Sequence, residues 1–396
     1  MIGTPLRFIL LALSLALVTT PAAAQAPTLQ GTLEAVRAKY DLPSLAGAVA
    51  IKGRIVASGA VGSRVRGRDL PVTVDDRYHL GSDTKAMTAT IAAMLVDEGK
   101  LRWDSSIGEV LGDDLPGSHA KFLAINLEQL LSHTSGLPSD NKQMIDLYIS
   151  GDVYDFDLTN YRKRIIKAIG KAEPVLPPNG SPFQYSNFGY IIAGAMIEKV
   201  TGEPWESLIH QRIFAPLKLT TAGLGPQATM GLYDAPVGHD VENGVASPRP
   251  WGPSADVPAV MGPAGNAHMS IRDFARWASW NAAQGKRGPA LVKADTLKSL
   301  HTPRVKTPVI ENPKPGTPKT GEYALGWGFA KFDWAERPLL THNGSNSMNL
   351  ASILLDPVSD VAIVVTTNFP GEKADLAILE LMKTLYLQHA KPAPRP

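Results

Sequence analysis

The 396-residue chain contains no cysteine. This absence excludes disulfide bonds, thiolate catalysis, cysteine-based metal sites and a lipid-anchored cysteine. A strong charge of either sign is also absent, since 39 basic and 37 acidic residues give a formal net charge of +2. A nearly neutral chain carries no electrostatic signature of a nucleic-acid or anionic-membrane partner, so neither is expected. The densest basic cluster, residues 162–164, is expected on a solvated face.

Long hydrophobic runs are scarce. The run at residues 8–18 is shorter than the roughly 20 apolar residues that span a bilayer. Arg7 precedes it and Ala22-Ala23-Ala24 follows it, which is the order of a secretory signal peptide with its cleavage site. We therefore expect residues 1–24 to be a signal peptide and the mature chain to begin near Gln25. The protein is then exported to the periplasm or the medium, with no transmembrane segment in the mature chain.

Apolar patterning predicts strands at both ends of the chain. Residues 45–51 and 55–61 are short apolar runs separated by Lys52-Gly53-Arg54, typical of a β-hairpin. Four further strands are expected near the C-terminus, at 323–329, 338–342, 349–355 and 361–367. Helices are expected at 30–40, 82–98, 127–133, 188–200, 204–214, 270–283 and 372–389.

This order of elements predicts an α/β (α+β) fold. We expect one lobe built from residues 25–105 and 300–396, with a mainly helical lobe inserted from 106–299. A cleft between two lobes is a common place for an active site.

The segment Ser82-Asp83-Thr84-Lys85 is the first candidate for chemistry. On a helix, side chains three residues apart share a face, so the serine hydroxyl and the lysine amine become neighbours. A serine becomes a nucleophile when a nearby base takes its proton, and a lysine is such a base when burial keeps it neutral. Taken singly, Ser82 is also a suitable helix N-cap, and Lys85 could reach the surface along its stem.

The Ser-x-x-Lys spacing occurs three times, at Ser82, Ser118 and Ser139. The second and third occurrences lie in polar segments. Lys85 instead begins an apolar run to Val96 with no other charge, so its helix is expected to be buried nearly all round and the lysine desolvated. Context therefore favours Ser82.

Tyr185-Ser186-Asn187 is the one Tyr-x-Asn in the chain and precedes an apolar helix. A tyrosine sharing a proton with Lys85 can pass protons to a leaving group, and Asn187 can donate to a substrate carbonyl. A packed loop tyrosine and an N-cap asparagine are the structural alternatives.

A third element is expected at a strand edge beside the nucleophile, where glycine lets backbone N–H groups approach the substrate. His342-Asn343-Gly344 ends a predicted strand. Lys319-Thr320-Gly321 and Lys314-Pro315-Gly316 fall in a Pro-rich loop at 303–321, and His79-Leu80-Gly81 directly precedes the nucleophile. We therefore choose His342, whose alternative is an ordinary strand histidine.

The ordered set Ser82-x-x-Lys85, Tyr185-x-Asn187 and His342-x-Gly344 resembles the class C β-lactamase family, which includes D-stereospecific peptidases, penicillin-binding proteins and serine esterases. Flanking segments are similar as well, at 130–138, 183–194, 198–202, 323–327 and 364–368. The resemblance covers nearly all of the mature chain. It implies a β-lactamase-like fold, with an antiparallel sheet flanked by the terminal helices.

The resemblance also implies roles. Ser82 would be acylated, with Lys85 and Tyr185 as general base and then acid. The backbone N–H groups of Ser82 and Ser345 would form the oxyanion hole. Asn187, His342, Gly344 and Ser345 would contact or orient the substrate, a small molecule or peptide. No cofactor or metal is implied.

Two departures from the family pattern bear on the substrate. Histidine stands at 342 where most β-lactamases of this family have lysine, and residues 345–349 are unusually polar. Both bear on the substrate and not on the mechanism: the histidine favours an ester or peptide over a β-lactam, while the polar segment could recover part of the β-lactam binding through hydrogen bonds. The sequence specifies neither the physiological substrate nor the oligomeric state.

Other hydrolase classes lack their motifs here, since the chain has neither Gly-x-Ser-x-Gly nor His-Glu-x-x-His. The remaining alternative is a catalytically silent peptidoglycan- or peptide-binding protein on the same fold. The three intact motifs argue against it.

Overall fold

The computed structural model describes residues 28–150, 157–175, 181–243 and 245–390. The predicted signal peptide and its cleavage position lie outside these residues. Among the described residues, no helix is both long and apolar enough to cross a bilayer.

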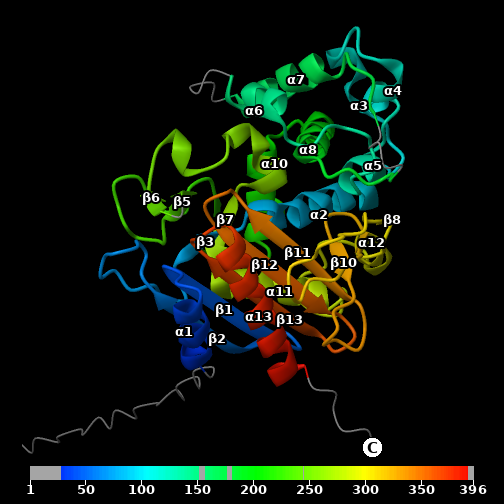
Figure 1. Ribbon diagram of the computed structural model, residues 1–396. Coiled ribbons are helices and arrows are strands. Elements are labelled where there is room, and N and C mark those ends of the chain that lie inside the picture. The colour runs from blue at the N-terminus through cyan, green and yellow to red at the C-terminus, as the bar shows by residue number, and fades with distance from the viewer. Residues whose placement is uncertain (1–27, 151–156, 176–180, 244, 391–396) are drawn as a thin grey trace, which may run out of the picture.

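An eight-stranded antiparallel sheet forms the centre of the lower half of the molecule in Figure 1. Its order is β2-β1-β13-β12-β11-β10-β9-β8. The strands are β1 Ser44–Ile51, β2 Arg54–Gly62, β8 Val305–Lys306, β9 Glu322–Tyr323, β10 Gly328–Ala330, β11 Leu339–Ser345, β12 Leu350–Asp356 and β13 Val361–Thr367. The N-terminal hairpin pairs with the last strand, with Val49 opposite Ile363. The predicted antiparallel sheet from both chain ends is thus confirmed.

The strand expected at 323–329 is instead two short strands, β9 and β10, joined by a tight turn. The Ala324 N–H donates to the Trp327 carbonyl at 2.7 Å. Gly326 in this turn has φ +81°, and a Cβ there would lie 3.0 Å from the Ala86 Cα. A glycine at 326 therefore allows both the turn and its close approach to the buried helix that follows the nucleophile.

Helices cover both faces of the sheet. On one face lie α1 Gln30–Lys39 and α13 Glu372–His389, whose apolar residues, such as Leu33 and Leu381, pack in one cluster with strand residues such as Val365. On the other face lies α11 Ile271–Ala282, which contacts β1, β12 and β13. α11 falls within the range 106–299 expected to form the helical lobe, yet one side of it is an apolar stripe that the sheet buries.

Most of the remaining helices lie above the sheet, while α12 Ala294–Leu300 lies beside β8 and β10 (Figure 1). They include α2 Thr84–Asp97, buried from Thr84 to Leu95, and α8 Asn187–Thr201, which packs against it. The others are α3 Ile107–Leu111, α4 Ala120–Leu123, α5 Leu127–Leu131, α6 Lys142–Ile149, α7 Leu158–Ile169, α9 Trp205–Ile209 and α10 Gly262–Gly265. The helix expected at 204–214 is α9 followed by a π-helical turn, His210–Phe214.

Two small sheets complete the described fold. One has the order β3-β7-β4, from Arg77–His79, Ala267–Ser270 and Gly223–Leu224. The other pairs β5 Gly238–Glu242 with β6 Val245–Arg249.

The expectation of a solvated face for residues 162–164 is wrong for Arg162, which is fully buried. Its guanidinium pairs with the carboxylates of Glu198 and Glu206 and also donates to the Val260 carbonyl. These partners offset the cost of burying the charge, and together they tie α7 to α8 and α9.

Candidate active site

The nucleophile candidate lies on a short turn between β3 and α2. Ser82 is the middle residue of a 3₁₀ turn, Gly81–Asp83, and α2 starts two residues later. The N-cap position of α2 is Asp83, without a side-chain capping bond, so the Ser82 hydroxyl is not used as a helix cap. The half-buried hydroxyl is therefore available for chemistry.

The end of β11 lies directly against this turn, and glycine makes the contact possible. A Cβ at Gly344 would overlap the Leu80 carbonyl oxygen, and one at Gly81 would overlap the backbone of Ser345. Gly81 also has φ +50°, and its N–H donates to His79 Nδ1 at 3.0 Å. The predicted need for glycine at 344 thus has a physical cause, and the backbone of Ser345 lies beside that of Ser82.

Lys85 is fully buried beneath the hydroxyl. Its Nζ lies 2.9 Å from Ser82 Oγ, 2.6 Å from Asn187 Oδ1 and 2.7 Å from the Ala264 carbonyl oxygen. Burial lowers the pKa of Lys85 to about 7, against the opposing charges of Asp140 and Asp83. A neutral amine has two N–H groups, which Asn187 and Ala264 can accept, and its lone pair then faces Ser82.

Tyr185 approaches the same hydroxyl from the other side. Its OH donates to Ser82 Oγ at 2.9 Å, and its ring centroid lies 4.9 Å from Lys85 Nζ. Burial raises the pKa of Tyr185, so the phenol stays protonated near neutral pH. The buried ring of His133 packs against it at 4.2 Å between centroids, and His133 Nδ1 accepts the Ser186 N–H at 3.1 Å.

Asn187 is the first residue of α8, with Ser186 at the N-cap position, so the asparagine is not the cap. Its Nδ2 donates to Asp140 Oδ2 at 2.6 Å, while its Oδ1 accepts from Lys85. The exposed Asp140 carboxylate can accept but not donate, and this fixes which end of the amide faces the lysine.

The other two Ser-x-x-Lys serines lie apart from the nucleophile position. Ser139 Oγ donates to the Tyr185 carbonyl at 2.6 Å and so supports the backbone of that tyrosine. Ser118 packs against Gly170, just beyond α7. Neither serine has Lys85 as a neighbour.

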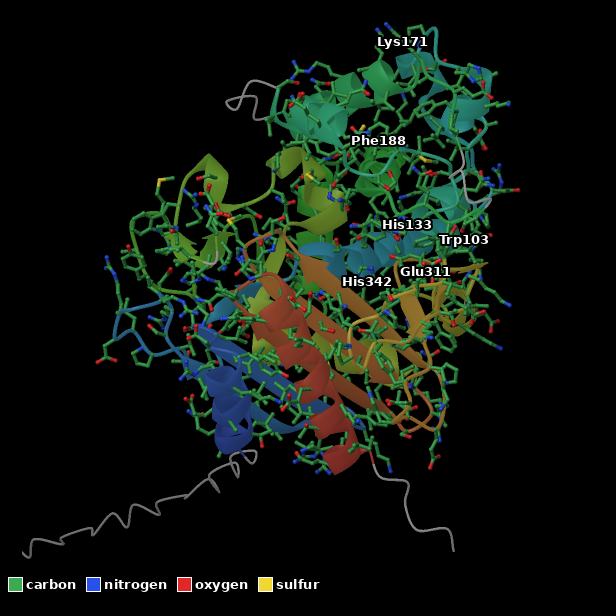
Figure 2. All side chains as sticks on the ribbon, in the orientation of Figure 1. Trp103, His133, Lys171, Phe188, Glu311 and His342 are labelled. Atoms are coloured by element: carbon green, nitrogen blue, oxygen red, sulfur yellow. The ribbon has the colours of Figure 1, made fainter. Side chains whose placement is uncertain are left out.

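His342 lies in the wall behind the nucleophile, near the junction of the sheet with the helices, as does His133 (Figure 2). It is 7% exposed. Its Nε2 lies 2.9 Å from the Tyr323 OH, and its Nδ1 lies 3.4 Å from Asp83 Oδ1. Burial raises the pKa of Asp83 to about 6, although the neighbouring His342 and Lys85 oppose the rise. Both ring nitrogens of His342 therefore face protein groups.

The rival lysine motifs lie elsewhere. The Lys319 carbonyl accepts the Ile310 N–H within the Pro-rich loop, at 2.8 Å. Lys314 forms an ion pair with Asp375 of α13.

Ser82, Lys85, Tyr185 and Asn187 thus form one hydrogen-bonded cluster. Sequence reasoning missed Asp83, Asp140 and Tyr323 as its neighbours, and the Ala264 carbonyl. Asp83 and Asp140 are the second residues of two Ser-x-x-Lys segments, at Ser82 and Ser139. An acidic residue in such a segment is the signal that could have identified them. No group of three or more His, Cys, Asp or Glu side chains among the described residues is placed to hold a metal ion.

An antiparallel sheet covered by helices, with a Ser–Lys–Tyr cluster at the start of a buried helix, defines the class of β-lactamase-like proteins. The family model described as Beta-lactamase matches residues 29–384, and the chain belongs to this family.

Penicillin-binding protein 4 of Amycolatopsis lactamdurans is 27% identical over 344 residues, covering 86% of this chain and 84% of that protein. A D-stereospecific amidohydrolase from Streptomyces has a similar structure, with a TM-score of 0.68 and 22% identity over 92% of this chain and 98% of that one. A class C β-lactamase from Rhodobacter sphaeroides gives a TM-score of 0.68 with 19% identity, over 91% and 99% of the two chains. The predicted family and fold are therefore confirmed.

Proposed function

We propose that this protein is a serine hydrolase that forms an acyl-enzyme on Ser82 and hydrolyses an ester or amide. The observation that carries the proposal is that Ser82 Oγ lies 2.9 Å from both Lys85 Nζ and the Tyr185 OH. The hydroxyl thus has a base of lowered pKa on one side and a proton donor on the other.

In acylation, the neutral amine of Lys85 takes the hydroxyl proton while Ser82 Oγ attacks the substrate carbonyl carbon. The resulting oxyanion would accept from the backbone N–H groups of Ser82 and Ser345, and one such donor is worth about 3 kcal/mol in the transition state. Tyr185 then gives its proton to the leaving group and regains one from Lys85 as the tetrahedral intermediate collapses.

In deacylation, water takes the place of the leaving group. The cluster removes a proton from the water as it attacks the acyl carbon, and Ser82 Oγ leaves with a proton returned through Lys85 or Tyr185. The enzyme is restored and the carboxylic acid is released.

Two features of the site favour an ester or amide over a β-lactam. Both His342 nitrogens face protein groups, so the histidine is a poor anchor for a substrate carboxylate. The exposed Asp140 carboxylate next to Asn187 adds a negative charge that disfavours an anionic substrate. The Streptomyces relative named as a D-stereospecific amidohydrolase supports an amide among the candidates.

The predicted signal peptide supports an exported enzyme that meets a small-molecule or peptide substrate outside the cytoplasm. The similarity to penicillin-binding protein 4 agrees with a place of action outside the cytoplasm.

Covalent labelling separates the proposal from a silent binding protein on the same fold. A fluorophosphonate probe should label the wild type, with the modified peptide containing Ser82. Ser82→Ala should abolish labelling, while the matched control Ser118→Ala should retain it. An unlabelled wild type that binds peptidoglycan fragments would favour the silent binder instead.

A further inference from the structure

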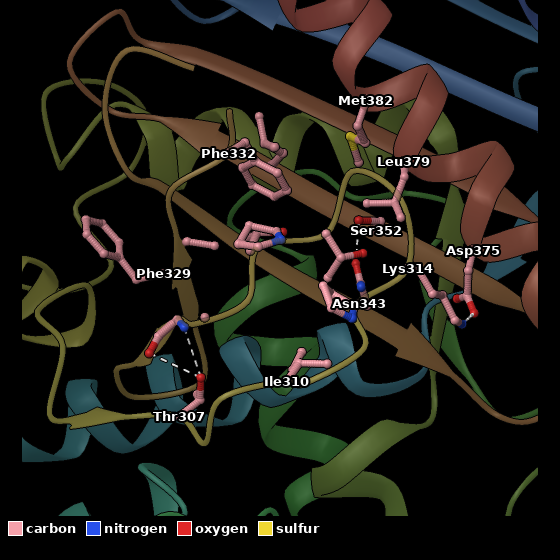
Figure 3. Close-up of a pocket in the computed structure, with 18 of the residues that line it drawn as sticks. Thr307, Ile310, Lys314, Phe329, Phe332, Asn343, Ser352, Asp375, Leu379 and Met382 are labelled. Atoms are coloured by element: carbon pink, nitrogen blue, oxygen red, sulfur yellow. Dashed lines mark hydrogen bonds and ion pairs between the residues drawn. The ribbon is translucent and has the colours of Figure 1, made fainter. Parts of the chain in front are cut away.

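A cavity lies against α13, on the face of the sheet opposite the nucleophile (Figure 3). Its volume is about 570 Å³, a size that suits a small organic ligand. Successive side chains of a strand point to opposite faces, so Thr341 and Asn343 of β11 line this cavity while His342 and Gly344 face the Ser82 turn. Ser82, Lys85, Tyr185 and Asn187 do not line it, whereas Tyr323, whose OH contacts His342, does.

The outer wall of the cavity is the Pro-rich loop between β8 and β9, and that loop is held in place. Thr307 exchanges backbone and side-chain hydrogen bonds with Gly321 at 2.9 to 3.1 Å. Further in, the Ile310 N–H donates to the Lys319 carbonyl at 2.8 Å. The Lys314–Asp375 ion pair then ties the loop to α13. One wall of the cavity is therefore anchored to the sheet edge and to α13.

The lining is mostly apolar. Side chains from the loop, the segment after β10, β12 and α13 contribute, including Ile310, Phe332, Leu354, Leu379 and Met382. Such a surface suits an alkyl chain or ring rather than a strongly hydrated group.

The charged groups that line the cavity have partners of opposite sign nearby. Lys314 and Asp375 pair with each other, and Glu322 of β9 stands opposite Lys306 of β8 in the strand register. Because each lining charge lies beside one of opposite sign, a neutral ligand is favoured over an anion or a cation.

Two amides line the cavity, Asn312 of the loop and Asn343 of β11, and Asn343 is the one on the sheet. Asn343 Oδ1 accepts from Ser352 Oγ at 2.7 Å, so the Nδ2 group is the donor that remains for a ligand. Asn343 is exposed to this side of the sheet although it sits in the middle of a strand pair.

We propose that this cavity binds a neutral apolar molecule with one carbonyl oxygen, of the class of fatty amides and fatty esters. The carbonyl accepts from Asn343 Nδ2, and the chain lies between the loop and α13, against Leu354 and Leu379. The site is separate from the proposed hydrolase site and does not depend on its activity.

Calorimetric titration of the whole chain carrying Ser82→Ala tests the proposal without turnover of the probe. Decanamide should bind saturably at one site, and more tightly than decanoate or decylamine of the same chain length. Leu379→Trp fills the cavity from a half-buried position of α13 and should weaken decanamide binding at least tenfold. The matched control Val358→Trp, on a side chain that is 76% exposed outside the cavity, should leave it unchanged.

Asn343→Asp keeps the size and the acceptor for Ser352 but removes the amide donor. It should weaken decanamide about fivefold, the effect of one neutral hydrogen bond, and strengthen decylamine. Asn343 is exposed, so this variant should fold even if Leu379→Trp does not. Absence of saturable binding would overturn the proposal. So would decanamide binding that both folded variants leave unchanged, because the probe would then sit elsewhere.

Discussion

The charge of Asp140 should set the pH at which Ser82 becomes reactive. Acylation needs the neutral amine of Lys85, so the labelling rate should rise with pH along a single ionisation near pH 7, the value to which burial lowers the pKa of Lys85. Asp140 raises that pKa, because its carboxylate favours the ammonium form. Asp140→Asn should therefore lower the pKa of Lys85 and move the acid limb to lower pH.

The magnitude follows from the contacts. Two hydrogen bonds through the Asn187 amide place the Asp140 carboxylate at roughly 7 Å from Lys85 Nζ. Asp140 is exposed, so a water-like dielectric applies, and the interaction is about 0.6 kcal/mol, or about half a pKa unit. The neutral fraction of Lys85 at pH 6 should then rise about threefold. Above pH 9 the variant and the wild type should react alike.

The assay is the second-order rate constant of fluorophosphonate labelling between pH 5 and pH 10, which needs no knowledge of the natural substrate. Asn retains a side-chain oxygen that can accept from Asn187 Nδ2, so the geometry is kept while the charge is lost. Asp104→Asn, at a side chain that is 78% exposed, is the charge-matched control and should leave the profile in place. High salt should shrink the difference between Asp140→Asn and the wild type. An acid limb that stays fixed, or moves to higher pH, would refute the role of Lys85 as the titrating base.

Four further outcomes are expected. His342→Ala should lower turnover of a p-nitrophenyl ester at least tenfold, or about 1.4 kcal/mol of barrier. The reason is the loss of the contacts that His342 makes with Asp83 and Tyr323 behind the nucleophile. The control Lys319→Ala should change turnover little. The wild type should hydrolyse p-nitrophenyl butyrate with a higher kcat/KM than nitrocefin, and His342→Lys should shift that ratio towards nitrocefin; rapid nitrocefin turnover with negligible esterase activity would contradict this. Gly344→Ala should abolish labelling or lower the melting temperature, since its methyl group would overlap the Leu80 carbonyl oxygen. Lys85→Met should stabilise the protein at pH 6, and this gain should disappear towards pH 10. Burial lowers the pKa of Lys85 below its unfolded value of about 10.4. The buried ammonium therefore costs the wild type stability in full below pH 7, and the cost vanishes above the unfolded pKa. Thermal unfolding at the two pH values checks the last expectation.

Local sequence patterns predicted most of the elements and part of the site. Alternating or continuous apolar runs predicted the N-terminal hairpin, β12, β13 and the helices α1, α2, α8, α11 and α13, because burial on one face or all round leaves a periodic record in the sequence. The 12-residue helix α7 was missed. Ser82 lies on a 3₁₀ turn and not inside α2, yet its hydroxyl still lies next to the Lys85 amine. In a 3₁₀ helix as in an α-helix, side chains three residues apart lie on the same face.

The parts that sequence reasoning missed depend on long-range packing. The Ala264 carbonyl comes from a backbone position whose side chain carries no signal of its use. Asp140 reaches the site because the segment before α6 folds against the start of α8. The cavity behind β11 needs the register of β11 on β12 and the path of the Pro-rich loop, neither of which a local pattern specifies.

The uncharged, apolar run after Lys85 both made its helix predictable from the sequence and gives the lysine its proposed role as a base. The run from Ala86 to Leu95 is apolar or uncharged at every position, and the structure buries all of it among α8, α9, α10 and α12. A lysine at the start of such a helix cannot reach solvent along its stem, so desolvation lowers its pKa and supplies a base near neutral pH. The folded chain bears the cost of that burial at every pH below the unfolded pKa of the amine, and it can do so because the surrounding core is large. A polar substitution in this run that admitted water would therefore raise the pKa of Lys85 and lower the fraction of neutral amine near pH 7, without touching any residue that contacts the substrate.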